Sequence, residues 1–358
     1  MKKNAIVLTG KTLDELKEFV ESQEESKFRA QQLFEWLYKF KVSSFDEMTN
    51  LSNEFRGILN RVASINSITL VNSQTSKIDG TSKFLFKLFD GNKIESVLIL
   101  PRETAVDAEK RLTICISTQV GCPLDCKFCA TASMGFTRNL TAGEIIEQII
   151  FVEKFAGKKI TNVVFMGMGE PMLNYKEVMK ACDLLTDNKG MSITPKKITI
   201  STAGYVDGIK KMADEKRKMK LALSLHSLDD KTRIKIMPIT KKYSVEELIK
   251  SLKYYSEKTG FSVMLEYILF SGLNDTEKDI ALLTKLHKRI PMRINIIPFH
   301  NIEFTKPKGI GHDLKSASRE EIKSFSAKLQ SNGVLVFTRN SSGADIDAAC
   351  GQLAISSK

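Results

Sequence analysis

The sequence predicts an α/β protein: a partial (β/α) barrel preceded by a small helical domain and a β-hairpin. Helix-start motifs near the N-terminus predict the helical domain, β-prone runs around a tight turn predict the hairpin, and alternating strand and helix patterns predict the barrel. The 358 residues are 42% hydrophobic and 27% charged, which is typical of a globular protein with one large domain and a smaller one. We expect an N-terminal domain over residues 1–100 and a barrel core with a C-terminal tail over residues 101–358.

The N-terminal domain contains two helix-start motifs, Thr-x-x-Glu at residues 12–15 and Ser-x-x-Glu at residues 44–47. In such capping boxes, each of the two side chains accepts a hydrogen bond from a free backbone N–H at the helix start. Residues 28–40 carry apolar side chains at helical spacing. Two β-prone runs follow, residues 83–88 and 94–100, and the Asp-Gly-Asn turn between them predicts a hairpin.

From about residue 111, apolar β-branched runs alternate with helical stretches. The predicted strands are residues 112–117, 162–166, 198–202, 221–225, 262–268, 294–299 and 334–337. Capping boxes at Thr141, Ser244 and Ser318 mark the starts of three helices between them. Strands joined by helical crossovers form a parallel sheet, whose ligands bind at the C-terminal strand ends. The number of units favours a complete or partial barrel, with a doubly wound open sheet as the alternative.

The chain is strongly basic, with a formal net charge of +12. Nucleic acid is the leading class of partner for such a surface, because binding releases condensed counterions, although a solvated basic face would explain the charge equally well. The apolar run at the N-terminus is too short for a signal peptide, and no window approaches a membrane span. We expect a cytoplasmic protein with no membrane partner. Six cysteines in such a protein favour metal binding or catalysis over disulfides.

Three of the cysteines, Cys122, Cys126 and Cys129, form a C-x3-C-x2-C motif directly after a predicted strand. Soft thiolates suit iron, and a loop of this length lets three of them bind one iron–sulfur cluster. Three ligands leave one iron of a cubane with an open position. Structural zinc is the alternative, but it needs four ligands, and the chain has no second CxxC pair and only four histidines.

Polar residues occur at the predicted ends of four further strands. They fall in the segments at residues 165–171, 201–204, 223–227 and 295–299. Each could be an ordinary buried polar residue satisfied by backbone groups. Their recurrence at successive strand ends predicts that they line one mouth of a barrel.

The cysteine motif, with an aromatic residue before its last cysteine, resembles the radical S-adenosylmethionine (SAM) superfamily. That resemblance implies a [4Fe–4S] cluster whose open iron binds SAM and cleaves it to a radical. Together with the segment Gly343–Leu353 and the FRAQQLFEWLY helix, the strand-end motifs closely resemble the adenosine-C2 RNA methyltransferases of the RlmN type, over nearly the whole chain. The likeness implies that seven residues contact SAM: Gly169, Glu170, Ser201, Ser224, Leu225, His226 and Asn295.

The same likeness implies roles for two cysteines outside the cluster motif, Cys350 in the tail and Cys115 in the first core strand. Cys350 would take a methyl group from one SAM, and a second SAM would supply the radical that activates this S-methylcysteine to attack adenine C2. Cys115 would help deprotonate C2 and form a transient disulfide with Cys350, while Glu95 matches a carboxylate proposed as proton acceptor. Taken alone, Cys115 could be a buried small hydrophobe and Glu95 an exposed strand residue.

The implied partners are 23S rRNA and, in some members of the family, tRNA beside the anticodon. An external electron donor such as flavodoxin or ferredoxin would be needed, and we expect a monomer. Arg29, Lys39 and Lys41 would help the N-terminal helices dock RNA. The closest alternative is the sister group that methylates adenosine C8 and confers antibiotic resistance. A non-catalytic RNA-binding protein and a radical SAM enzyme for a small molecule are further alternatives.

Overall fold

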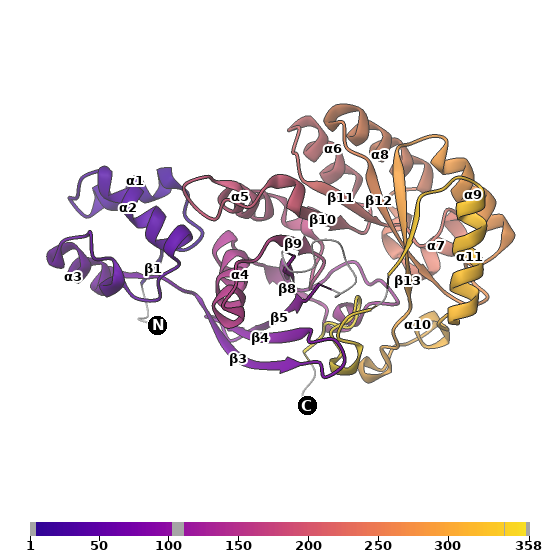
Figure 1. The fold of residues 1–358 in the computed structure, drawn as a ribbon, viewed down its shortest axis with the longest axis horizontal. Helices are drawn as coiled ribbons and strands as arrows, with labels where there is room; N and C mark the ends of the chain where they lie inside the picture. Colours follow the sequence, from indigo (N-terminus) through magenta and orange to yellow (C-terminus); the bar gives the residue numbers. More distant parts are fainter. Residues whose placement is uncertain (1–4, 102–110, 340, 356–358) are drawn as a thin grey trace.

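The computed structural model describes residues 5–101, 111–339 and 341–355. The N-terminal helices form a separate lobe beside the sheet-containing core (Figure 1). Its elements are α1 (Leu13–Ser22), α2 (Phe28–Glu35) continued by a π-helical turn η1 (Trp36–Phe40), η2 (Phe45–Glu47) and α3 (Asn53–Val62). A short parallel pair, β1 (Ile6–Val7) with β2 (Ala63–Ser64), ties its two ends together. Both predicted capping boxes are present, at Thr12 and Ser44.

The core contains one ten-stranded sheet. Its antiparallel part is β3 (Ile68–Thr75), β4 (Ser82–Leu88) and β5 (Lys93–Ile99). Its parallel part is β6 (Thr113–Cys115), β9 (Asn162–Phe165), β10 (Ile198–Thr202), β11 (Lys220–Ser224), β12 (Val263–Leu269), β13 (Met292–Pro298) and β14 (Val336–Thr338). The predicted hairpin is therefore the β4–β5 pair.

The order of the parallel strands distinguishes the two folds that the sequence left open. They follow one another in chain order from β6 to β14, without the reversal of a doubly wound sheet. In the described part of the chain β14 pairs only with β13, and β6 pairs with β5 on its other side. The core is therefore a partial barrel, extended at its first strand by the hairpin.

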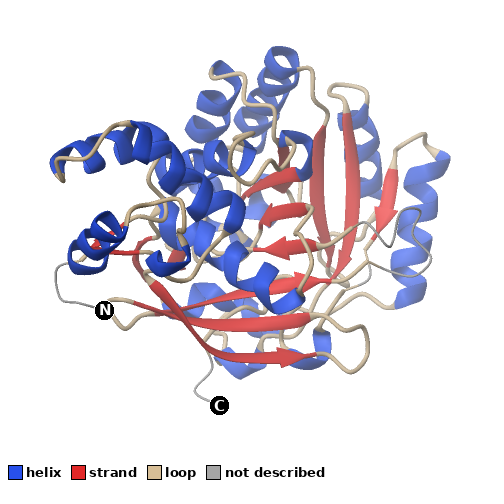
Figure 2. Cartoon of the chain, turned by 60° about the vertical axis from the view of Figure 1, so that its left-hand side comes forward, coloured by secondary structure: helices blue, strands red, loops and turns tan. Residues whose placement is uncertain are grey.

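Helices cover the outer face of the curved parallel sheet (Figures 1 and 2). The longer ones are α4 (Ala142–Ala156), α5 (Tyr175–Thr186), α6 (Val206–Asp214), α8 (Val245–Thr259), α9 (Glu277–His287) and α11 (Arg319–Ser331). Two short helices, α7 (Asp230–Ile236) and α10 (Ile310–Asp313), lie instead against the backbone of Lys127. The predicted capping boxes at Thr141, Ser244 and Ser318 open α4, α8 and α11. None of the helices in the described ranges combines the length and apolar character needed to cross a bilayer.

Candidate active site

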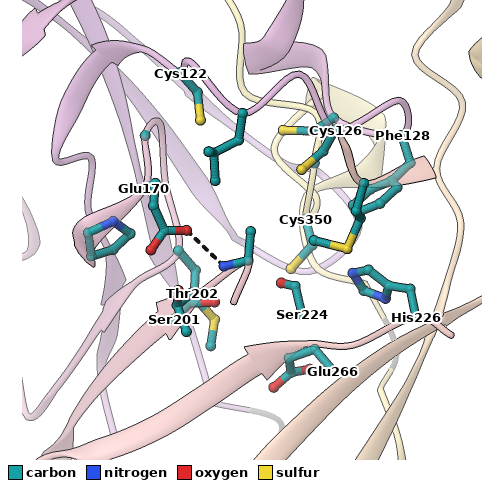
Figure 3. A pocket seen from close by; sticks show the side chains of 18 of the residues that line it. Cys122, Cys126, Phe128, Glu170, Ser201, Thr202, Ser224, His226, Glu266 and Cys350 are labelled. Carbon is teal, nitrogen blue, oxygen red and sulfur yellow. Dashed lines mark hydrogen bonds between the residues drawn. The ribbon is translucent and has the colours of Figure 1, made fainter. Parts of the chain in front are cut away.

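A cavity lies at the C-terminal ends of the barrel strands, and most of the predicted site residues line it (Figure 3). The lining residues include Cys122, Cys126, Cys129, Gly169, Glu170, Ser201, Ser224, His226 and Cys350. They come from the loop after β7 (Gln119–Gly121), from the ends of β9, β10 and β11, and from the C-terminal tail. The placement agrees with the expectation that successive strand ends share one mouth.

The loop that carries the three cysteines is fixed at both ends and in its middle. The Cys122 N–H donates to Gly135 O at 2.8 Å, the Lys127 N–H to Ile236 O at 2.9 Å, and the Ala130 N–H to Gly351 O at 2.6 Å. Gly121, with φ of +73°, packs so closely on β8 (Phe136–Asn139) that a Cβ would lie 1.8 Å from Gly135 O. The backbone therefore places the thiols before any cofactor binds.

The chemistry of these thiols fits a cluster. Burial raises the pKa of Cys122 to about 12 and also raises the pKa of Cys126 and Cys129, so cationic iron is needed to hold them as buried thiolates. Among the residues that the structure describes, no three Cys, His, Asp or Glu side chains meet closely enough to hold one metal ion. A cubane binds each cysteine through a different iron, so it needs thiols around one space and not at one point. The donor set fits a [4Fe–4S] cluster better than zinc.

Glu170 is buried beside the cluster loop. Its carboxylate accepts from the Ala203 N–H at 2.7 Å, drawn in Figure 3, and from the Met172 N–H at 3.1 Å. Burial raises the pKa of Glu170 to about 7 despite these hydrogen bonds, which lower it. The preceding Gly169 has φ of +103° and lies so close to Gln119 that a side chain would collide with it. The carboxylate is thus held on the cavity wall by the turn after β9.

His226 follows β11 in a left-handed conformation, with φ of +55°. Its Nδ1 accepts from the Ile268 N–H at 2.9 Å, so in the neutral ring Nε2 carries the proton. Burial, together with the charge of Arg233, lowers the pKa of His226 to about 3. The ring packs edge-on against Phe128 of the cluster loop, with centroids 4.6 Å apart. His226 therefore offers the cavity a neutral hydrogen-bond donor.

Two predicted residues lie behind the cavity wall. Leu225 is fully buried, and its carbonyl accepts from Arg233 Nε at 3.0 Å. Asn295 is 2% exposed and donates from Nδ2 to Glu266 Oε1 at 2.7 Å. Glu266 lines the cavity, so Asn295 contacts a cavity-lining side chain without lining the cavity itself.

The two additional cysteines meet at a second cavity behind the first. Cys115 lines only the second cavity, whereas Cys350 lines both, together with Cys129 and Glu266. Both cysteines are free thiols here, so the predicted disulfide is not formed in this structure. Burial raises the pKa of Cys115. Residue 350 as a whole is exposed, but desolvation of its thiol among the cavity walls, together with the charge of Glu266, raises the pKa of Cys350. Cys182, the remaining cysteine, is buried on α5, away from both cavities.

Glu95 lies outside both cavities. It is 5% exposed, so it is not an exposed strand residue, and its Oε1 lies 3.4 Å from Lys83 Nζ. Burial raises the pKa of Glu95 to about 7, and Lys83 opposes that shift. Lys83 also donates to Asp347 O at 3.3 Å, which connects this buried pair to the tail that carries Cys350.

Three residues of the site carry no recognisable motif and were not predicted from the sequence: Lys83, Arg233 and Glu266. A lone glutamate within the apolar run Val263–Leu269 was an available signal, because every residue of β12 is buried. Arg233 and Lys83 stand in amphipathic segments, where a charged residue is expected to face solvent, so no signal in the sequence indicated that they are buried. Of the basic residues expected to dock RNA, Lys41 forms an ion pair with Glu153 and holds the N-terminal lobe to α4.

Comparison with known proteins identifies the family. The Radical SAM superfamily profile matches residues 116–284, and the profile of the ribosomal RNA large subunit methyltransferase N-terminal domain matches residues 6–65. Proteins described as "Probable dual-specificity RNA methyltransferase RlmN" are 44% identical in Thermotoga neapolitana, over 96% of each chain, and 41% identical in Clostridium perfringens, over 96% of this chain and 94% of that one.

A solved structure extends the likeness to three dimensions. A radical SAM methyltransferase from Sphaerobacter thermophilus superposes with a TM-score of 0.89 at 36% identity, covering 97% of this chain and 99% of that one. Radical SAM enzymes use a [4Fe–4S] cluster and SAM, and the cysteine loop described above has the donors for that cluster. The chain belongs to the RlmN family of radical SAM methyltransferases.

Proposed function

We propose that this protein methylates C2 of a specific adenosine in 23S rRNA and of an adenosine beside the anticodon in tRNA. The proposal rests on the position of Cys350. This residue lines both the cavity of the cluster cysteines and the cavity of Cys115. A thiol at this position can exchange groups with ligands on either side. The names of the relatives favour this activity over methylation at C8.

The surrounding residues have defined tasks in this proposal. When bound, the cluster and SAM supply the radical chemistry that an unactivated aromatic carbon requires. Gly169, Glu170, Ser201, Ser224, Leu225, His226 and Asn295 hold SAM, either directly or through the residues that they position. Cys350 carries the methyl group to the base. Cys115 and Glu95 serve the removal of the C2 proton and the release of the product.

The proposal includes the partners and the compartment. An electron donor such as flavodoxin or ferredoxin reduces the cluster, and the protein acts as a monomer in the cytoplasm, where its RNA substrates are found. The net charge of +12 supports an RNA substrate, because basic side chains are the usual partners of phosphates. The adenine must be unpaired or flipped to bring its C2 atom into the cavity at the strand ends.

The test is anaerobic reconstitution of the cluster, followed by incubation with SAM, a chemical reductant and unmethylated 23S rRNA or tRNA. Mass spectrometry of the digested nucleosides then reports the product. We expect 2-methyladenosine from the wild-type protein and none from Cys350→Ala, whose iron content should equal that of the wild type. Cys122→Ala is the contrasting variant, because it should lose the cluster as well as the product.

Other products would change the conclusion. Detection of 8-methyladenosine would replace the proposed regiochemistry with that of the sister group. Cleavage of SAM without any modified base would contradict an RNA substrate while leaving the radical SAM chemistry in place.

A further inference from the structure

Arg233 of α7 is a buried cation at the base of the active site. It is 1% exposed and is the largest of the fully buried side chains in the described residues. Its guanidinium donates to Ala203 O at 2.7 Å, Ser224 O at 3.0 Å and Leu225 O at 3.0 Å, and to Thr240 Oγ1 at 2.7 Å. The three carbonyls follow β10 and end β11, so one side chain joins the ends of two neighbouring strands.

All four of these acceptors are neutral. Within the described ranges, Arg233 forms no salt bridge with a carboxylate, and Asp230, one turn earlier on α7, acts on it only at longer range. Burying a charge without an opposite charge is costly, because the interior solvates it poorly. None of the direct partners of Arg233 offsets its charge, so an anion bound in the adjoining cavity would stabilise this buried cation.

The cluster site adjoins this cation. Ala203 and Ser224, whose carbonyls accept hydrogen bonds from Arg233, line the same cavity as Cys126. The cluster loop is also fixed to α7, since the Lys127 N–H donates to Ile236 O at 2.9 Å.

We propose that Arg233 is a positioning residue that provides the fixed positive charge for the cluster and thereby raises its reduction potential. Three thiolates outweigh the charge of the oxidised cubane core, so the bound cluster is a net anion, and reduction adds one more negative charge. A nearby buried cation stabilises the reduced form more than the oxidised form. The hydrogen bonds to the three carbonyls keep this cation at a constant place relative to Cys126.

The experiment is a redox titration of the reconstituted protein, followed by electron paramagnetic resonance of the reduced cluster. Arg233→Met and Arg233→Gln remove the charge, and Arg233→Lys keeps it. Lys235→Met removes the same charge from an exposed position of the same helix and is the matched control. We expect the neutral variants to make reduction at least tenfold less favourable, which is about 59 mV for a one-electron couple. Arg233→Lys and Lys235→Met should stay near the wild-type potential.

A wild-type potential in a neutral variant with full iron content would overturn the proposal. If neither neutral variant assembles a cluster, Arg233→Lys distinguishes the charge from the hydrogen bonds, because a lysine cannot reproduce all four of them. A cluster at the wild-type potential in this variant would support the proposed role of the charge, and loss of the cluster would overturn it. The measurement uses no RNA, so its outcome is independent of the proposed adenosine substrate.

Discussion

At the scale of single residues, His226 shows how the fold fixes one protonation state. Its ring is 2% exposed, its Nδ1 accepts a backbone N–H, and Arg233 lies close enough to disfavour a second proton. The pKa is thereby lowered from its ordinary 6.5 to about 3. The side chain remains a neutral donor throughout the physiological pH range.

This shift makes folding stability depend on pH. Between pH 6.5 and 3 the unfolded chain binds a proton at His226 and the folded chain does not. The contribution of this residue to the free energy of unfolding is therefore fully present above pH 6.5 and decreases as the pH falls. The slope is about 1.4 kcal/mol per pH unit, or roughly 2 kcal/mol between pH 6.5 and 5. Asparagine tolerates the left-handed backbone at this position. From pH 6.5 to pH 5, the unfolding free energy of His226→Asn should therefore fall by roughly 2 kcal/mol less than that of the wild type.

Urea denaturation of the cluster-free protein at pH 7 and pH 5 measures the effect without acid loss of the cofactor. His312→Asn is the control, because His312 is exposed on α10 and its replacement should leave the pH dependence unchanged. Equal pH dependence in the wild type and in His226→Asn would contradict the prediction.

The sequence predicted the site best where chemistry dictates spacing. Cys122, Cys126 and Cys129 could be found because all three cluster ligands stand on one loop, at a spacing typical of an iron–sulfur site. Glu266 and Arg233 could not be found in this way, since each acts alone, and its partners, Asn295 and the strand-end carbonyls, come from distant segments. Burial of a charged side chain is a property of the packed core, which the local pattern does not reveal.

At the scale of elements, the cluster loop depends on the contact between β7 and β8. Gly121 and Gly135 face each other there, and a Cβ on Gly121 would lie 1.8 Å from Gly135 O, the acceptor of the Cys122 N–H. Gly121→Ala must therefore separate the two strands and displace Cys122. We expect a large loss of iron per chain and a destabilisation well above the ~1 kcal/mol that a left-handed alanine alone costs.

Iron and sulfide content, together with the urea midpoint, measure this outcome. Gly157→Ala is the matched control, because Gly157 also has a positive φ, of +60°, at the end of α4 but has no atom within 4 Å of an added Cβ. It should cost about 1 kcal/mol and leave the iron content unchanged. A Gly121→Ala protein with full iron would show that the loop tolerates separation of the strands.

The elements themselves were predicted unevenly. Helix starts were accurate, because a capping box is a local hydrogen-bond pattern that the sequence encodes directly, as at Thr141 and Ser244. Strand β3 was missed because it is an edge strand with mostly exposed residues and a break in register between Leu70 and Asn72. The β7–β8 pair was missed because each strand has at most four residues.

At the scale of the whole molecule, Glu147 joins the N-terminal lobe to the core. This fully buried residue of α4 accepts hydrogen bonds from the Ser67 N–H at 2.8 Å, the Ser67 hydroxyl at 2.9 Å and the Ile68 N–H at 2.9 Å. These donors lie where the lobe ends and β3 begins. Val97 pairs with Cys115, so the sheet contains strands from both sides of residue 100. The predicted domain boundary between residues 1–100 and 101–358 therefore stays a prediction.

Glu147→Ala would leave three buried donors without their acceptor, each costing about 1–3 kcal/mol. We expect residues 6–65 to exchange their amide hydrogens faster, while β10 to β13 keep their protection. Hydrogen exchange followed by mass spectrometry measures both regions in one experiment. Glu18→Ala, at an exposed position of α1, should change neither region, and unchanged exchange in Glu147→Ala would exclude this role for the carboxylate.

Strand β6 is hydrogen-bonded on both sides, to β5 and to β9. Cys115 therefore belongs to a stiff part of the molecule, whereas Cys350 lies in a tail of turns, held through single contacts such as Thr131 Oγ1 to Leu353 O. A bond between the two sulfurs, about 2 Å long, would have to be reached by travel of the tail alone. In the proposed cycle the Cys350 thiol would then contact the methyl donor, the RNA base and Cys115 in turn. The turnover rate could not exceed the rate at which the tail moves between these positions. Because solvent viscosity slows such movement, turnover would then depend on viscosity.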